Sequence, residues 1–169
     1  MTEPLAFDPI AEARRQWETR WPEASATMAA ATSVIRAQQI VLNTVDAVLR
    51  PFSLTFARYE AMAMLSFTRH GEMPLGKMRL RLMILPTSVT NIIDRLCEDG
   101  LVNRVAHPTD RRTTLAVITE EGRALAAKAS EAVNGVRFGL GELDADQLAT
   151  LTNIVTELRR RTGDFTNPD

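Results

Sequence analysis

The stretch from residue 86 to residue 118 constrains the fold of this chain more than any other. The run PTSVTNIIDRLCEDG opens with a proline, which favours the start of a helix, and closes with a glycine, which favours a helix end. Its apolar residues recur at helical spacing and predict one buried face: Val89, Ile92, Ile93 and Leu96. Two runs rich in Val, Leu and Thr follow at 101–106 and 113–118, joined by the polar loop HPTDRR. This pattern predicts a β-hairpin directly after the helix.

The chain before this stretch predicts two helices that begin at prolines. Asp8-Pro9 can start a short helix, and Pro22 can start a long one that ends at Leu49. Along the long helix, apolar residues recur every seven positions: Val34, Val41 and Val48, with Ile35, Leu42 and Leu49 beside them. Such a stripe suits either a long core helix or a helix that packs against a second subunit.

Shorter helices are predicted on both sides of the hairpin. Thr55 can cap one of them, and the run HGEMP at 70–74 is expected to form a loop. The short helix that follows this loop has one apolar face: Leu75, Met78 and Leu82. After the hairpin, one helix is expected over 119–140 and a last one from about Asp144.

The composition excludes several classes of protein. Cys97 is the single cysteine, which excludes an internal disulfide, and with only His70 and His107 beside it a zinc site is not expected. No apolar run approaches the ~18 residues of a membrane span, and the N-terminus has no signal-peptide pattern, so a cytoplasmic protein is expected. Without a Ser-His-Asp spacing, a Gly-rich phosphate loop or a metal-ligand cluster, we expect neither an enzyme nor a cofactor.

Charge and element order together point to nucleic acid. The net charge is -1, but residues 69–112 carry more basic than acidic side chains. A short helix, a turn, a second helix and a hairpin form the plan of a winged helix-turn-helix, whose second helix fits the major groove of double-stranded DNA. The residues expected to face that groove are Pro86, Thr87, Ser88, Thr90, Asn91 and Arg95. The hairpin tip, with Asp110, Arg111 and Arg112, suits the minor groove, although Pro-x-Asp is also common in solvated turns.

At this point the residues resemble a known family. The stretch LPTSVTNIIDRLCEDGLVNRVAHPTDRRTTLAVITEEGRAL closely resembles the MarR family of bacterial regulators, with its D-R-L-x-x-x-G-L-V run, its D-R-R wing and its L/I-T-x-x-G run. The detailed resemblance covers about residues 49–124. It implies a homodimer that reads a pseudo-palindrome, with Arg112 in the minor groove and Asp110 supporting it. It also implies a repressor that small, often aromatic or anionic, ligands release from DNA.

The expected fold is mainly α with a small β-hairpin wing. A winged helix-turn-helix lobe is expected at 51–119, between N-terminal dimerisation helices at 1–50 and C-terminal dimerisation helices at 120–163. A flexible tail is expected at 164–169.

Three apolar residues depart from the family pattern: Leu80, Met83 and Leu85, where such proteins often carry polar side chains near DNA. The Leu85 side chain cannot cap the helix that begins at Pro86. Either a DNA phosphate or water must therefore accept hydrogen bonds from the first N–H groups of that helix. These three residues also define the alternative function, a protein-interaction module whose winged helix no longer binds DNA.

An effector site is suggested at the N-terminus. An N-terminal helix that carries a tryptophan, here Trp17 with Arg20 nearby, resembles the urate-responsive branch of the family. That branch also has an acidic residue in its second helix, and Glu60 is the corresponding candidate in this chain. The alternative is that Trp17 and Trp21 cover a dimer core. Cys97 is flanked by Glu98 and Asp99, which disfavour a thiolate and argue against redox sensing.

Overall fold

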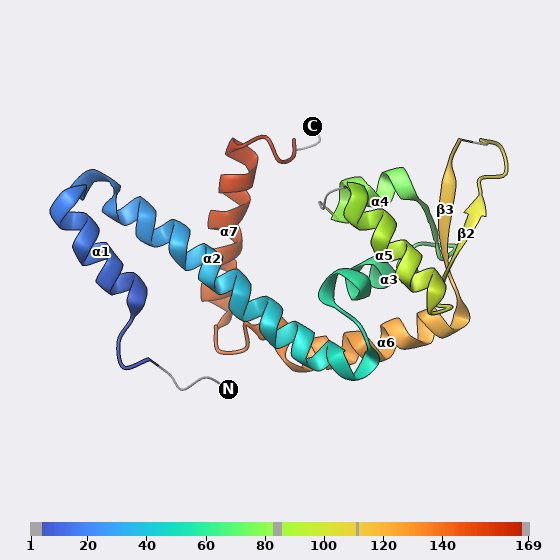
Figure 1. Cartoon of the computed structure of the whole chain (residues 1–169), viewed down its shortest axis with the longest axis horizontal. Coiled ribbons are helices and arrows are strands. Elements are labelled where there is room, and N and C mark those ends of the chain that lie inside the picture. Colours follow the sequence, from blue (N-terminus) through green and yellow to red (C-terminus); the bar gives the residue numbers. More distant parts are fainter. Residues whose placement is uncertain (1–4, 83–85, 111, 167–169) are drawn as a thin grey trace.

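The computed structural model describes residues 5–82, 86–110 and 112–166, and shows a mainly helical chain with a small antiparallel sheet (Figure 1). This confirms the expected fold class. The elements, in chain order, are α1 (Pro9–Arg20), α2 (Pro22–Leu49), α3 (Phe56–Ser66), β1 (Glu72–Pro74), α4 (Leu75–Leu82), α5 (Pro86–Glu98), β2 (Val102–Ala106), β3 (Thr114–Ile118), α6 (Glu120–Gly135) and α7 (Ala145–Arg161), with 3-10 turns at Arg50–Phe52 and Arg137–Gly139.

The helix starts follow the capping residues that the sequence indicated. The Asp8 side chain accepts a hydrogen bond from the Ile10 N–H, and Thr55 caps α3 in the same way. Asp144 and Gln147 form a reciprocal capping box at the start of α7. Each cap satisfies backbone donors that a helix leaves free at its first turn.

The lobe from α3 to β3 is held by one apolar core. Fully buried side chains from α3, α4, α5 and the sheet meet there, and α6 covers it from the other side: Met62, Leu65, Met78, Val89, Ile93, Leu96, Val102, Ala129 and Val133. Burying side chains of this size stabilises a fold by roughly 1.5–3 kcal/mol each. The core therefore fixes the faces that α4 and α5 turn outward.

The sheet holds a strand that the sequence did not predict. Residues 70–74 were expected to form a loop, but Glu72–Pro74 is a strand, β1, in the sheet order β1-β3-β2. Gly71, at φ +71°, turns the chain so that its carbonyl accepts the Ile118 N–H at 2.8 Å. Pro74 is tolerated because it ends an edge strand, where its missing N–H costs no ladder bond.

The helix after the hairpin is shorter than predicted. A continuous helix was expected over 119–140, but α6 ends at Gly135 and a tight turn follows. Arg137 and Phe138 have positive φ values of 47° and 52°, which a continuing helix does not allow. Gly139 then lies so close to α2 that an added Cβ would stand 3.1 Å from the Cβ of Thr44. The close approach of this turn to α2 sets the direction in which α7 leaves.

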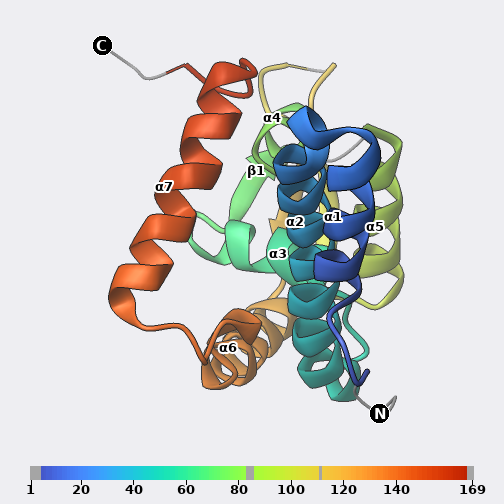
Figure 2. The same cartoon turned by 90° about the vertical axis from the view of Figure 1, so that its left-hand side faces the viewer.

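The terminal helices extend away from the lobe. In Figure 1, α1 lies beside the first half of α2, at the end far from the hairpin, and Figure 2 shows α7 standing apart from the other helices. None of the α7 residues is buried. Within the described chain no single helix is long and apolar enough to cross a membrane, although the pair α2–α3, bent by 73°, meets that test by length and composition together.

Candidate nucleic-acid interface

Helix α5 presents a polar face opposite its buried one. Val89, Ile93 and Leu96 are fully buried, while Ile92 is only half-buried. Asn91 and Arg95 are exposed, and the side chains of Ser88 and Thr90 are half-buried. Arg95 donates to the Glu98 carboxylate at 2.9 Å, one turn further along the helix. The side chains of Pro86 and Thr87, and the whole of Arg111, lie outside the residues that the structure describes.

Arg104 in β2 fixes α5 against the hairpin. Its Nη2 lies 2.7 Å from Asp94 Oδ1 and donates at 3.3 Å to the carbonyl oxygen of Thr90. One guanidinium thus contacts two successive turns of α5. The sequence shows Arg104 only as one of the basic residues of 69–112, because its partnership with α5 depends on the angle between helix and strand.

A second guanidinium fixes the C-terminal end of α5. Arg58 in α3 forms an ion pair with Asp99, just after α5, and donates to the Ser53 carbonyl at 2.9 Å. Its Nε is buried and has no hydrogen-bond partner in the described structure. The Arg58 side chain is only 18% exposed, so the pair is shielded from solvent on that side. Arg104 therefore holds the middle of α5, and Arg58 holds its C-terminal end.

Asp110 organises the hairpin tip through the backbone. Its Oδ1 accepts the Arg112 N–H at 3.0 Å, and its Oδ2 accepts the Thr113 hydroxyl at 2.7 Å. The Thr113 hydroxyl, and then the Arg112 N–H, lower the pKa of the Asp110 carboxyl. Asp110 makes no ion pair with the Arg112 guanidinium in the described structure. It shapes the turn that carries Arg112, and leaves that guanidinium available for an outside partner.

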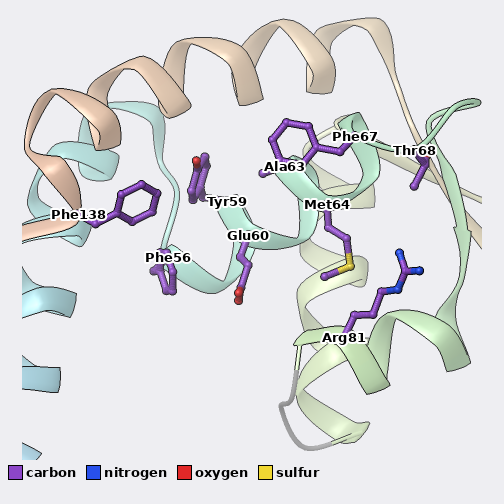
Figure 3. Close-up of a pocket in the computed structure, with 9 residues that line it drawn as sticks. All are labelled: Phe56, Tyr59, Glu60, Ala63, Met64, Phe67, Thr68, Arg81 and Phe138. Carbon is purple, nitrogen blue, oxygen red and sulfur yellow. The ribbon is translucent and has the colours of Figure 1, made fainter. Parts of the chain in front are cut away.

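A separate apolar pocket lies between α3, α4 and the turn after α6 (Figure 3). Its volume is about 540 Å³, and its walls are mostly aromatic and apolar: Phe56, Tyr59, Ala63, Met64, Phe67 and Phe138. Two charged side chains, Glu60 and Arg81, enter it from opposite elements (Figure 3). Burial raises the pKa of the Glu60 carboxyl. The pocket offers planar apolar walls with one acid and one fixed cation.

The structure does not bring the three predicted effector residues together. Glu60 lines the pocket beside α4, whereas Trp17 and Arg20 belong to α1, at the opposite end of α2 (Figure 1). Trp17 instead contacts Trp21, with ring centroids 5.3 Å apart and the ring planes tilted by 48°. Trp21 is the single residue between α1 and α2, so this contact is local to the turn that joins the two helices. In the described part of the chain, no group of three or more His, Cys, Asp or Glu is placed to hold a metal ion.

The buried core, the outward polar face of α5 and the adjoining hairpin define a winged helix-turn-helix protein. The profile of the MarR family matches residues 54–114, from the loop before α3 to the start of β3. The HTH-type transcriptional regulator YhbI of Bacillus subtilis is 36% identical over 118 residues, which is 68% of this chain and 74% of that protein. The chain belongs to the MarR family of transcriptional regulators.

Solved structures agree with this assignment. Sco5413, a MarR family transcriptional regulator from Streptomyces coelicolor, is 46% identical, with a TM-score of 0.77 over 84% of this chain and 99% of that chain. A MarR variant from E. coli, complexed with operator DNA, has a TM-score of 0.70 at 20% identity, over 84% of this chain and 96% of that chain. The second likeness is one of fold alone.

Proposed function

We propose that this regulator binds a pseudo-palindromic DNA operator as a homodimer, with α5 in the major groove and Arg112 in the minor groove. The observation that carries the proposal is the arrangement of α5, whose buried face packs in the core, whose middle is held by Arg104 and whose C-terminal end is held by Arg58. A rigid helix with small polar side chains outward can enter a groove about 12 Å wide. The residues proposed to contact DNA are Pro86, Thr87, Ser88, Thr90, Asn91, Arg95, Arg111 and Arg112.

The second copy is proposed to cover the apolar surface of the terminal helices. Ile154 and Leu158 in α7 are 64% and 56% exposed, and Val34 and Ile35 in α2 are more than half exposed. Monomeric proteins rarely leave such a stripe in water. We assign residues 1–50 and 120–163 to dimerisation, with two lobes whose α5 helices stand one helical turn of DNA apart, roughly 34–36 Å.

The pocket beside α4 is proposed to bind a small aromatic anion that releases the protein from DNA. Aromatic walls suit a planar ring, and Arg81 supplies a cation for its carboxylate or phenolate. Burial raises the pKa of the Glu60 carboxyl, so this acid takes up a proton more readily than a solvated carboxyl when an anion binds beside it. Since Arg81 lies on α4, which precedes α5, a ligand there acts on the lobe that carries the interface. Repression follows where the operator overlaps a promoter.

DNA binding is tested by fluorescence anisotropy with DNA from upstream of the protein's own gene, at several salt concentrations. Wild type should bind this DNA more tightly than unrelated DNA, with affinity falling as salt rises. Arg112→Ala should weaken binding, whereas Lys128→Ala, which removes an exposed charge from α6, should not. No binding by wild type at low salt would reject the proposal. It would favour a protein-interaction module built around Leu80, which is 81% exposed; Met83 and Leu85 lie outside the described residues.

The effector pocket is tested by calorimetry on the DNA-free protein with benzoate as the probe. Wild type should bind benzoate, and Arg81→Gln should bind it more weakly because the fixed cation is gone. Equal affinities of wild type and Arg81→Gln would place the anion elsewhere.

A further inference from the structure

A polar hollow of about 300 Å³ lies at the base of the wing, between the start of α4 and β3. Two guanidinium groups and two hydroxyl side chains line it: Arg79, Arg112, Thr113 and Thr114. Leu75 and Gly76, from the first turn of α4, complete the lining. A Cβ on Gly76 would meet nothing within 4 Å, so this side of the hollow is open.

The hollow carries two positive charges and no negative charge to balance them. No carboxylate is among its lining residues, and neither Arg79 nor Arg112 forms an ion pair through its guanidinium within the described structure. By contrast, Arg58, Arg95 and Arg104 each have a carboxylate partner. The acid next to the hollow, Asp110, is occupied by the Thr113 hydroxyl and the Arg112 N–H. Two like charges that line one hollow repel each other, and an anion between them removes that repulsion.

The fold holds Arg79 in this position. Met78 is fully buried and Leu82 is 5% exposed, so α4 cannot rotate about its axis without exposing its core face. Helical periodicity then places Arg79 on the same side as Leu75 and Gly76, four and three residues earlier. The first turn of α4 also lines the hollow, and a helix start favours negative charge.

We propose that this hollow, the wing-base seat (Arg79, Arg112, Thr113 and Thr114), holds one phosphate of the DNA backbone, with Arg79 as a second cation beside Arg112. The inference rests on the proposed DNA binding and adds a residue and a ligand group to it. A guanidinium carries five N–H donors, so Arg112 can contact this phosphate with one edge and the minor groove with the other. A free phosphate ion offers the same chemistry. The seat adjoins the wing, however, and in the proposed complex it would face the DNA strand that borders the minor groove.

The first test compares salt dependence on the operator duplex found upstream of the gene. Arg79→Ala should weaken binding about tenfold, to operator and unrelated DNA alike, because a phosphate contact carries no sequence information. Arg79→Lys, which keeps the charge, should recover part of the loss. A plot of log affinity against log salt has a negative slope. If both arginines hold one phosphate, the magnitude of this slope should decrease by about 1, and not by about 2, in the Arg79→Ala, Arg112→Ala double variant. Arg79 is exposed, so the variants should fold normally.

The second test locates the phosphate. A neutral methylphosphonate is placed at each backbone position of one half-site in turn. We expect one position near the wing at which this change weakens wild type but leaves the Arg79→Ala, Arg112→Ala double variant unaffected. Thermal unfolding at matched ionic strength, with inorganic phosphate replacing chloride, should show no difference between wild type and Arg79→Ala.

Other outcomes overturn the inference. If Arg79→Ala binds like wild type while Arg112→Ala is weakened, the seat is wrong and the proposed DNA binding stands. Specific stabilisation of wild type by inorganic phosphate, with no sensitive methylphosphonate position, would assign the seat to a free anion. Failure of wild type to bind any duplex would overturn both proposals.

Discussion

Gly122, in the first turn of α6, explains at the scale of one residue why a T-x-x-G run follows the hairpin. Thr119 caps α6 by accepting the Gly122 N–H at 3.0 Å, while its own hydroxyl lies 2.9 Å from the Gly100 carbonyl oxygen and 3.1 Å from that of Leu101. A Cβ on Gly122 would lie 2.1 Å from the Leu101 carbonyl oxygen. The cap therefore joins the end of α5 to the start of α6, and only glycine allows the two backbones to come this close.

Replacing Gly122 by alanine should accordingly lower the free energy of unfolding by about 1–3 kcal/mol, since backbone has to move. Gly135→Ala is the matched control in the same helix, because a Cβ there meets nothing within 4 Å. That variant should raise the free energy of unfolding by about 0.4–1 kcal/mol. Urea denaturation at one fixed protein concentration measures both. A Gly122→Ala protein as stable as wild type would show that the two backbones separate easily.

Glu60 gives a pH-dependent prediction at the same scale. Burial raises the pKa of its carboxyl in the folded protein, so the ionised form costs stability above that pKa and the cost disappears as pH falls through it. Glu60→Gln should therefore be more stable than wild type at neutral pH, and this advantage should shrink towards about pH 4. Urea midpoints of the two proteins across this range measure the difference. An advantage that is constant or grows on acidification would contradict the burial argument.

At the scale of elements, the position of α5 depends on contacts from β2. The Arg104–Asp94 pair is partly exposed, so it should add no more than about 0.2–1 kcal/mol to stability. Its larger effect should be on orientation, because a displaced recognition helix loses several contacts together. We expect Arg104→Met to leave the thermal midpoint nearly unchanged and to reduce the preference for operator over unrelated DNA. Lys128→Met, on α6, serves as the control. An unchanged preference in Arg104→Met would show that the core alone orients α5.

Elements with strong local signals could be predicted from the sequence, and those set by tertiary contacts could not. The caps at Asp8 and Thr55, the helix start near Asp144 and the buried positions Val89, Ile93 and Leu96 of α5 are local patterns, and the structure confirms them. Strand β1 is only three residues long and exists because β3 offers an open edge. The end of α6 at Gly135 likewise follows from the close approach of the next turn to α2.

The candidate sites show the same division. The polar residues of α5 and the tip arginines could be selected from the sequence, because they follow from helical periodicity and a motif. Arg58, Arg79 and Arg104 could not, since each acts on an element far away in the sequence. Trp17 and Glu60 do not meet within one chain, because α2 is long enough to keep their helices apart, so their shared ligand site stays a prediction.

At the scale of the whole molecule, α7 cannot be understood within one chain. It carries apolar residues at helical spacing, yet none of its residues is buried, and it stands away from the lobe (Figure 2). A helix of this kind gains most of its stability from packing an apolar face. A second copy that supplies the matching α7 and α2 surfaces would bury both stripes at once, and would place two α5 helices on one side of the assembly. In the proposed dimer, the contact between the two copies would therefore also set the spacing of the two α5 helices.

Placing a charge in that surface should separate the two copies. Ile154→Lys combined with Leu158→Lys should give a species of 18.8 kDa, the mass of one chain, by light scattering, because two charges cannot be buried unpaired. Leu80→Lys, at an exposed apolar residue on α4, should leave the mass at twice that value. The monomer should retain the circular dichroism of its lobe yet bind the operator on the order of 10²-fold more weakly, since each lobe then binds alone. If the double variant keeps both the dimer mass and wild-type affinity, α7 is not the dimer surface, and its exposed stripe requires a different partner.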